Sequence, residues 1–261
     1  MRVAIIGYGW VGKAMHKLFP EAVIYDPYQD QDIPKQQVDA CEIAFVCVPT
    51  PNKDPEGVLD TSIVEDVVSW IGCPLIVVRS TINPGDCDKW TKKYKKRIVF
   101  QAEFLGETPN HPLLDMKTRP FMVIGGAPMD RRELIDLYTT VYNSNITIRQ
   151  LTLYEAEICK LTENRAIGFK LMELHELYEA CEKAGVDYYI VRDTVYGDDS
   201  RFNLWFSFIY PNNLGFESSK CLRKDIPAWV AWSESIGYNA DITKLLIKRS
   251  KEYEKNQAKS K

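Results

Sequence analysis

One cysteine of the sequence stands in a polar, cationic stretch. In LGFESSKCLRKD, residues 214–225, Cys221 directly follows Lys220 and precedes Arg223 and Lys224. A structural cysteine is usually buried among apolar neighbours, whereas nearby cations favour the thiolate, which is the nucleophilic form. If these charges point towards the sulfur, the stretch holds a nucleophile able to add to a carbonyl carbon. The alternative is a surface loop that carries a thiol.

A lysine and an amide lie four residues apart in KLTEN, residues 160–164. Side chains at this spacing share one face of a helix, so Lys160 and Asn164 can direct their polar ends at one oxygen atom. The alternative is a solvated helix face, on which both residue types are common.

A glycine motif follows the first apolar run of the chain. Gly7, Gly9 and Gly12 stand between this run and a helical pattern. In that position the first glycine permits a tight turn, the second lets a pyrophosphate approach the backbone, and the third lets the helix pack on the strand. The N-terminus of that helix would then face the anion with free N–H groups.

Asp26 ends the second apolar run, nineteen residues after Gly7. A carboxylate there accepts hydrogen bonds from a ribose 2′-hydroxyl and repels a 2′-phosphate, which favours NAD over NADP. The alternative is an ordinary glycine turn with an aspartate that caps a helix.

The elements that position these residues can be read from the apolar pattern. Between residues 2 and 126, β-rich runs alternate with helical segments, which predicts a parallel sheet covered on both faces. The runs span residues 2–7, 22–26, 43–49, 75–81, 97–103 and 121–126, and the helical segments include 13–19 and 61–71. The predicted fold class is α/β, with an N-terminal doubly wound sheet of the Rossmann type.

The pattern changes near residue 150. From 153 to 183 apolar residues recur at helical spacing without a proline, which predicts one long helix that ends at Gly185. We therefore expect an NAD-binding domain at 1–150 and an all-α domain at 151–261 that carries Cys221. A long amphipathic helix rarely stays exposed, so we expect a homodimer through 153–183. The alternative is that the chain itself covers the helix.

Composition narrows the class of protein. The chain has 261 residues and a formal net charge of −3, which does not indicate a nucleic-acid or membrane partner. Seven cysteines, an odd number without a Cys-x-x-Cys pair, favour a reducing cytoplasm over a disulfide framework. The three histidines are too scattered to indicate a metal site.

Five motifs in order resemble those of the UDP-glucose and GDP-mannose (nucleotide-sugar) 6-dehydrogenases. They are VCVPTPNKDPEGVLD (46–60), RSTINPGD (79–86), AEFLGE (102–107), KLTEN (160–164) and CLRKD (221–225). The resemblance implies an NAD domain, a central helical domain that dimerises and a third domain that holds UDP. It also implies oxidation of a sugar C6 alcohol to a carboxylate with two NAD.

The resemblance assigns roles to matching residues. Cys221 would form a thiohemiacetal and then a thioester. Lys160 and Asn164 would hold the C6 oxygen and the water, with Asp225 as a hydrogen-bonding or base partner, and Glu103 would assist hydrolysis. The cofactor set is Gly7, Gly9, Trp10, Val11, Gly12, Asp26, Thr50, Thr81, Glu107 and Lys224, with Thr81 also near the water. The substrate set is Glu103, Phe104, Leu105, Lys160, Asn164, Arg201 and Gly215.

The sequence departs from the family pattern in three places. The match ends where the third domain would begin, so we expect a shortened form without the usual uridine pocket. GFESSKC stands where the family has a glycine-rich loop, and Glu217 would repel a diphosphate unless it turns away. The segment 201–213 is longer and richer in aromatic residues than its counterpart in the family. Its aromatic side chains could pack as core or offer a face to a base or sugar. These departures affect the identity of the substrate more than the reaction, and the substrate could be a UDP-sugar bound with fewer contacts or a smaller sugar phosphate.

Two other functions agree with the same motifs. A two-electron dehydrogenase of the β-hydroxyacid type also joins a Rossmann domain to a helical one, and it would leave Cys221 and Glu103 idle. A non-catalytic protein could bind NAD or a nucleotide sugar as a sensor or subunit. Two NADH per substrate and an acid product would distinguish the leading interpretation from the first alternative.

Overall fold

The computed structural model describes residues 1–28, 34–53, 57–104, 121–142, 145–204 and 206–259. The chain divides into two compact units, Met1–Lys160 and Leu161–Lys261, and the division falls within one helix. Each unit is described by itself. Among the described residues, no helix is both long and apolar enough to cross a bilayer.

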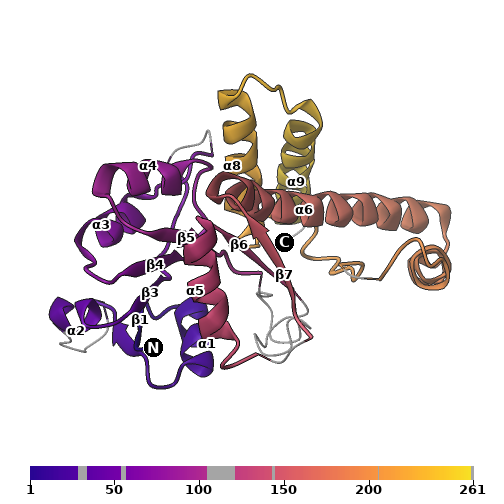
Figure 1. Cartoon of the computed structure of the whole chain (residues 1–261). Helices are drawn as coiled ribbons and strands as arrows, with labels where there is room; N and C mark the ends of the chain where they lie inside the picture. Colours follow the sequence, from indigo (N-terminus) through magenta and orange to yellow (C-terminus); the bar gives the residue numbers. More distant parts are fainter. Residues whose placement is uncertain (29–33, 54–56, 105–120, 143–144, 205, 260–261) are drawn as a thin grey trace. The chain divides into compact units, whose positions relative to one another are not determined.

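The first unit is built on a seven-stranded sheet with the order β2-β1-β3-β4-β5-β6-β7 (Figure 1). The strands are β1 Val3–Ile6, β2 Val23–Tyr25, β3 Ile43–Val46, β4 Leu75–Val78, β5 Ile98–Phe100, β6 Phe121–Gly125 and β7 Thr147–Leu151. Neighbouring strands are parallel except β5 and β6, which pair antiparallel at Phe100 and Gly125. The predicted α/β fold class is confirmed, with a mostly parallel sheet.

Helices cover both faces of this sheet. They are α1 Trp10–Leu18, α2 Lys35–Asp39, α3 Ser62–Trp70, α4 Asp86–Tyr94, α5 Pro128–Tyr138 and the start of α6, Leu153–Ala184. Successive residues of a strand point to opposite faces. Ile5 therefore packs with Met15 of α1 and Leu134 of α5, whereas Ile6 packs in a second cluster with Val68 of α3. This two-sided burial explains why the strands read as unbroken apolar runs.

The glycine turn after β1 is held by close backbone contact. Gly7 has a φ of +88°, in the left-handed region that favours glycine. A β-carbon on Gly12 would lie 2.0 Å from the carbonyl oxygen of Gly7. Both glycines are therefore required for α1 to start directly behind the strand.

The second unit is helical, as predicted. It contains the rest of α6, then α7 Tyr188–Arg192, a π-helical turn η2 Asp193–Asp198, α8 Leu222–Ser235 and α9 Asp241–Lys259. The prediction of one long helix is confirmed, because α6 runs unbroken to Ala184 and stops before Gly185, which has a φ of +68°. The predicted domain boundary at residue 150 stays a prediction.

One apolar cluster joins three helices of the second unit, α6, α8 and α9. Met172 of α6, Ile226 of α8 and Leu246 of α9 pack together in its core. A β-carbon on Gly168 would lie 2.4 Å from the Cδ1 atom of Ile226, so the missing side chain permits close packing of α8 on α6.

We expect Gly12→Ala to destabilise the first unit by about 1–3 kcal/mol, because the added methyl group overlaps the Gly7 carbonyl. Urea unfolding of the purified protein measures this. Gly9→Ala is the matched control, since a β-carbon there meets no atom within 4 Å. Equal losses of stability in the two variants would contradict the close contact between Gly12 and Gly7.

Candidate active site

The start of α1 has the geometry of an anion site. Gly9 is the N-cap residue of α1, and the open space around its α-carbon leaves room for a phosphate group. Trp10 is exposed and Val11 half-buried in the first turn. N–H groups at a helix N-terminus are unpaired within the helix and favour anions. The turn therefore fits a pyrophosphate.

Asp26 lies directly behind this turn. One carboxylate oxygen accepts the backbone N–H of Tyr8 at 2.7 Å, and the other accepts that of Tyr28 at 3.0 Å. These bonds fix the carboxylate beside the glycine turn, and each oxygen keeps a lone pair for a ribose hydroxyl. The residues present thus fit the adenosine half of NAD.

Predicted site residues of the first unit follow the carboxyl ends of three neighbouring strands. Thr50 follows β3 and is buried, Thr81 follows β4, and Glu103 follows β5 and is buried. In open α/β sheets, ligands bind at this edge. Lys160 of α6 reaches the same region, because its ammonium group lies 4.8 Å from the centre of the Phe104 ring. Leu105 and Glu107 lie outside the described residues.

Glu103 has a buried partner that the sequence did not indicate. Its carboxylate forms an ion pair with Arg79, the residue that follows β4, and also accepts the N–H of Phe104 at 2.7 Å. Arg79 further reaches the hydroxyl of Tyr138 at 3.5 Å. Burial alone would lower the pKa of Arg79, but the Glu103 carboxylate reverses this and the net pKa is raised. The ion pair therefore keeps both groups charged.

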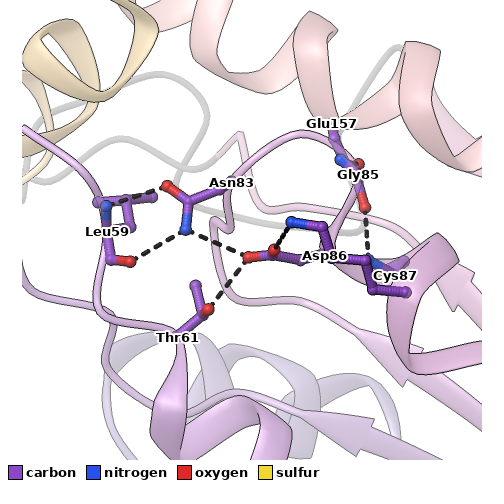
Figure 2. A network of polar contacts seen from close by, with 8 residues as sticks. Leu59, Thr61, Asn83, Gly85, Asp86, Cys87 and Glu157 are labelled. Atoms are coloured by element: carbon purple, nitrogen blue, oxygen red, sulfur yellow. Dashed lines mark hydrogen bonds and ion pairs between the residues drawn. The ribbon is translucent and has the colours of Figure 1, made fainter. Parts of the chain in front are cut away.

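A second buried carboxylate ties α6 to the start of α4 (Figure 2). The Glu157 carboxylate accepts the backbone N–H of Gly85 at 2.5 Å and that of Cys87 at 3.1 Å. These two donors belong to the first turn of α4, where helical N–H groups have no partner within the helix. Burial raises the pKa of Glu157 to about 7, although the two N–H groups act in the opposite direction.

The same network continues to the loop before α3 (Figure 2). Asn83 exchanges two hydrogen bonds with the backbone of Leu59, at 3.0 and 2.9 Å. Asp86 accepts from Thr61 at 3.0 Å and from Asn83 at 3.2 Å. The loops that follow β3 and β4 are therefore tied to each other and, through Glu157, to α6.

In the second unit, Asp225 is fully buried between two predicted site residues. Its carboxylate accepts the side-chain amide of Asn164 at 2.5 Å and lies 2.7 Å from the ammonium group of Lys224. Cys221 is half-buried and is the N-cap residue of α8, with no disulfide. The structure thus brings Asn164, Lys224 and Asp225 together at the start of the helix that Cys221 caps.

Arg201 and Gly215 were also predicted to bind substrate, and each has a partner within the second unit. The Arg201 side chain is exposed and pairs with Asp199 at 2.6 Å, beside a shallow cavity of about 480 Å³ that Tyr196 and Phe202 help to line. The N–H of Gly215 donates to the ring of His175 at 3.0 Å.

Burial lowers the pKa of His175 to about 4, so its ring is neutral and accepts this bond. The aromatic residues Phe208 and Tyr210 are exposed rather than core, and Trp205 lies outside the described residues.

Comparison with known proteins gives the family. The model for the NAD binding domain of the UDP-glucose/GDP-mannose dehydrogenase family matches residues 15–144, and that for its central domain matches residues 154–251. The chain belongs to the UDP-glucose/GDP-mannose dehydrogenase family. The predicted resemblance is confirmed at this level.

Several relatives have known names or structures. UDP-glucose 6-dehydrogenase of Rickettsia bellii is 24% identical over 249 residues, which are 91% of this chain and 56% of that protein. TuaD of Bacillus subtilis, also a UDP-glucose 6-dehydrogenase, is 27% identical over 83% of this chain and 47% of its own. The UDP-glucose dehydrogenase structure from Pyrobaculum islandicum aligns with a TM-score of 0.80 at 22% identity, over 97% of this chain and 68% of that one. The chain spans about half the length of the curated relatives it matches.

Membership of the dehydrogenase family does not by itself identify Arg79, Asn83 or Glu157. All three lie in or beside the motifs that indicated the family, but the motifs give no role to any of them. The sequence could have indicated Glu157 alone. It lies next to Ala156 in the apolar stripe of a helix, and a carboxylate buried there needs a hydrogen-bonding partner.

We expect Arg79→Met to lower the free energy of unfolding by about 3–5 kcal/mol, because it leaves the buried Glu103 carboxylate without its cation. Adding Glu103→Gln should recover much of this loss. Chemical denaturation measures both changes. Arg132→Met is the control, since Arg132 and its partner Asp136 are exposed and the pair contributes little.

Glu157 should make the stability of the protein depend on pH. Its pKa rises from 4.5 to about 7 on folding, so the folded state loses stability relative to Glu157→Gln as pH rises through this window. The difference between wild type and variant should change by roughly 3 kcal/mol between pH 4.5 and 8. Unfolding curves at several pH values measure it.

Glu155→Gln is the control for this linkage. Hydrogen bonds from Thr152 lower the pKa of the exposed Glu155, so its contribution has the opposite sign and is lost as pH falls. Asp86 of α4, an acidic group that acts on Glu157, is present in both variants. The same pH dependence in both would contradict the assignment to Glu157.

Proposed function

We propose that this chain is an NAD-dependent nucleotide-sugar dehydrogenase that oxidises a C6 primary alcohol to a carboxylate, in the manner of UDP-glucose 6-dehydrogenases. The observation that carries the proposal is the Asn164–Asp225–Lys224 chain around the buried Asp225 carboxylate at the start of α8, the helix that follows Cys221. The family resemblance assigns Asn164 and Asp225 to the reaction and Lys224 to the cofactor. Relatives named UDP-glucose 6-dehydrogenase support the choice of substrate class.

The cofactor would bind at the glycine turn, with its pyrophosphate at Gly9 and the start of α1 and a ribose at Asp26. When bound, NAD accepts a hydride from the substrate carbon in each of two oxidation steps. The remaining work falls to side chains of the protein, which hold the substrate oxygen, supply the nucleophile and activate water.

In the first oxidation the C6 alcohol loses a hydride and a proton and becomes an aldehyde. Lys160 and Asn164 would hold the C6 oxygen. The Cys221 thiolate then adds to the aldehyde carbon, forming a C–S bond, and the resulting thiohemiacetal loses a second hydride to give a thioester. Water attacks the thioester, the C–S bond breaks, and the carboxylate and free thiol are released. Glu103 would take a proton from this water as a general base.

The position of Cys221 suits the nucleophile. An anion is favoured at a helix N-terminus, and Cys221 caps a helix of 14 residues. Thr50 and Thr81 would lie near the nicotinamide and the water, and Phe104 would line the substrate site beside Lys160.

The organisation of the protein in the cell is part of the same proposal. None of the seven cysteines, all of which lie among the described residues, forms a disulfide, which agrees with a reducing cytoplasm. The long helix α6 would provide the core of a two-fold homodimer, an arrangement that buries the same face in each copy. A two-electron dehydrogenase and a non-catalytic binding protein are the alternatives, and neither requires Cys221.

We expect Cys221→Ser to abolish formation of the acid while NAD still binds, because a hydroxyl group is a much weaker nucleophile than a thiolate. Turnover of a panel of nucleotide sugars is followed as NADH and product, and NAD binding is followed by calorimetry. Wild type should form two NADH per acid. Cys159→Ser, at an exposed free cysteine, is the control. One NADH and a carbonyl product would instead favour the two-electron alternative.

A further inference from the structure

Three segments of the first unit carry residues assigned to the reaction. Thr50 lies in the loop after β3, Thr81 in the loop after β4, and Lys160 in α6. We propose that Glu157 and Asn83 are positioning residues that lock these three segments into one arrangement, so that their polar groups meet the substrate together. This inference rests on the proposed function, because it concerns the residues assigned there.

Glu157 holds α6 against the loop that carries Thr81. Its two carboxylate oxygens accept N–H groups on either side of Asp86, which fixes both the distance and the rotation of α6 about this point (Figure 2). Lys160 follows Glu157 by three residues, so the two side chains are neighbours on the helix surface. Any shift of Glu157 is therefore transmitted to the ammonium group over Phe104.

Asn83 holds the loop that carries Thr50. Its side-chain amide pairs with both backbone groups of Leu59, as a strand neighbour would. Leu59 in turn bridges to Asn52, and the N–H of Asp60 donates to the carbonyl of Pro51 at 2.7 Å. Because Pro51 and Asn52 directly follow Thr50, the Asn83 contacts fix the position of Thr50 relative to Thr81.

Apolar packing could hold these elements together, but it would not fix them equally well. Packed apolar surfaces are non-directional, whereas paired hydrogen bonds hold donor and acceptor within a narrow range of distance and angle. A displacement of about 1 Å at a catalytic group can lower a rate roughly 100-fold. The network therefore provides positional accuracy at the carboxyl edge of the sheet.

The test compares Glu157→Gln with Glu155→Gln in the full chain. Glutamine keeps the size of Glu157 but turns an N–H donor towards one of the two backbone N–H groups. We expect kcat on a nucleotide sugar to fall at least roughly 10-fold, with the Kd for NAD within about two-fold of wild type. Glu155→Gln, on the exposed side of the same helix, should match wild type in both.

A readout independent of turnover is the rate at which an acylating reagent modifies Lys160, measured by mass spectrometry. Lys160 is buried in the wild type, so it should react slowly compared with the exposed Lys89. In Glu157→Gln its rate relative to Lys89 should rise. If Glu157→Gln fails to fold, Asn83→Ser, which removes the pairing with Leu59, takes its place in the kinetic comparison, with the same loss of kcat expected.

The outcomes separate the positioning role from the proposed function. Faster labelling of Lys160 with unchanged kcat would mean that Glu157 is only structural and would overturn the inference, as would unchanged labelling. If the wild type binds NAD but oxidises no member of the panel, the proposed reaction fails. The catalytic part of the inference then fails with the reaction, whereas faster modification of Lys160 in Glu157→Gln would still show that Glu157 fixes the position of Lys160.

Discussion

The buried carboxylate of Glu157 accepts two hydrogen bonds that join the start of α6 to the start of α4 within the first unit. They satisfy N–H groups at the start of α4 that the helix itself leaves unpaired. A carboxylate is suited to this because its two oxygens accept both bonds and its charge complements the helix dipole. Lys160 is placed by this connection, since it lies on the same helix, three residues away.

The first unit holds two buried glutamates whose partners give them different properties. Glu103 faces the guanidinium group of Arg79, and the ion pair favours the charged form of both. Glu157 accepts hydrogen bonds from two backbone N–H groups and from the Cys87 side chain, none of which is a cation, and burial raises its pKa to about 7. A carboxylate that must accept a proton from water needs to be ionised at neutral pH. The ion pair with Arg79 favours this form of Glu103, so it is relevant to the role proposed for Glu103 as well as to folding.

The sequence indicated the elements whose residues carry a local signal. Strands such as β1 and β4 are buried on both faces and read as apolar runs, and α6 shows helical spacing throughout. The edge strand β7 was missed because its residues are mostly exposed and polar. Arg79 and Asn83 were missed for another reason: each finds its partner 24 residues away, across loops whose path the pattern does not reveal.

The environment of Cys221, in the second unit, is likewise not revealed by the sequence pattern alone. The sequence placed three cations around the thiol, but a charge acts according to where its side chain points. The ammonium group of Lys224 lies 2.7 Å from the buried carboxylate of Asp225, which offsets much of its charge. The start of α8 is a source of positive potential that does not depend on a side-chain conformation. For the Cys221 thiolate of the proposed reaction, the N-terminus of α8 is therefore a better source of stabilisation than Lys224.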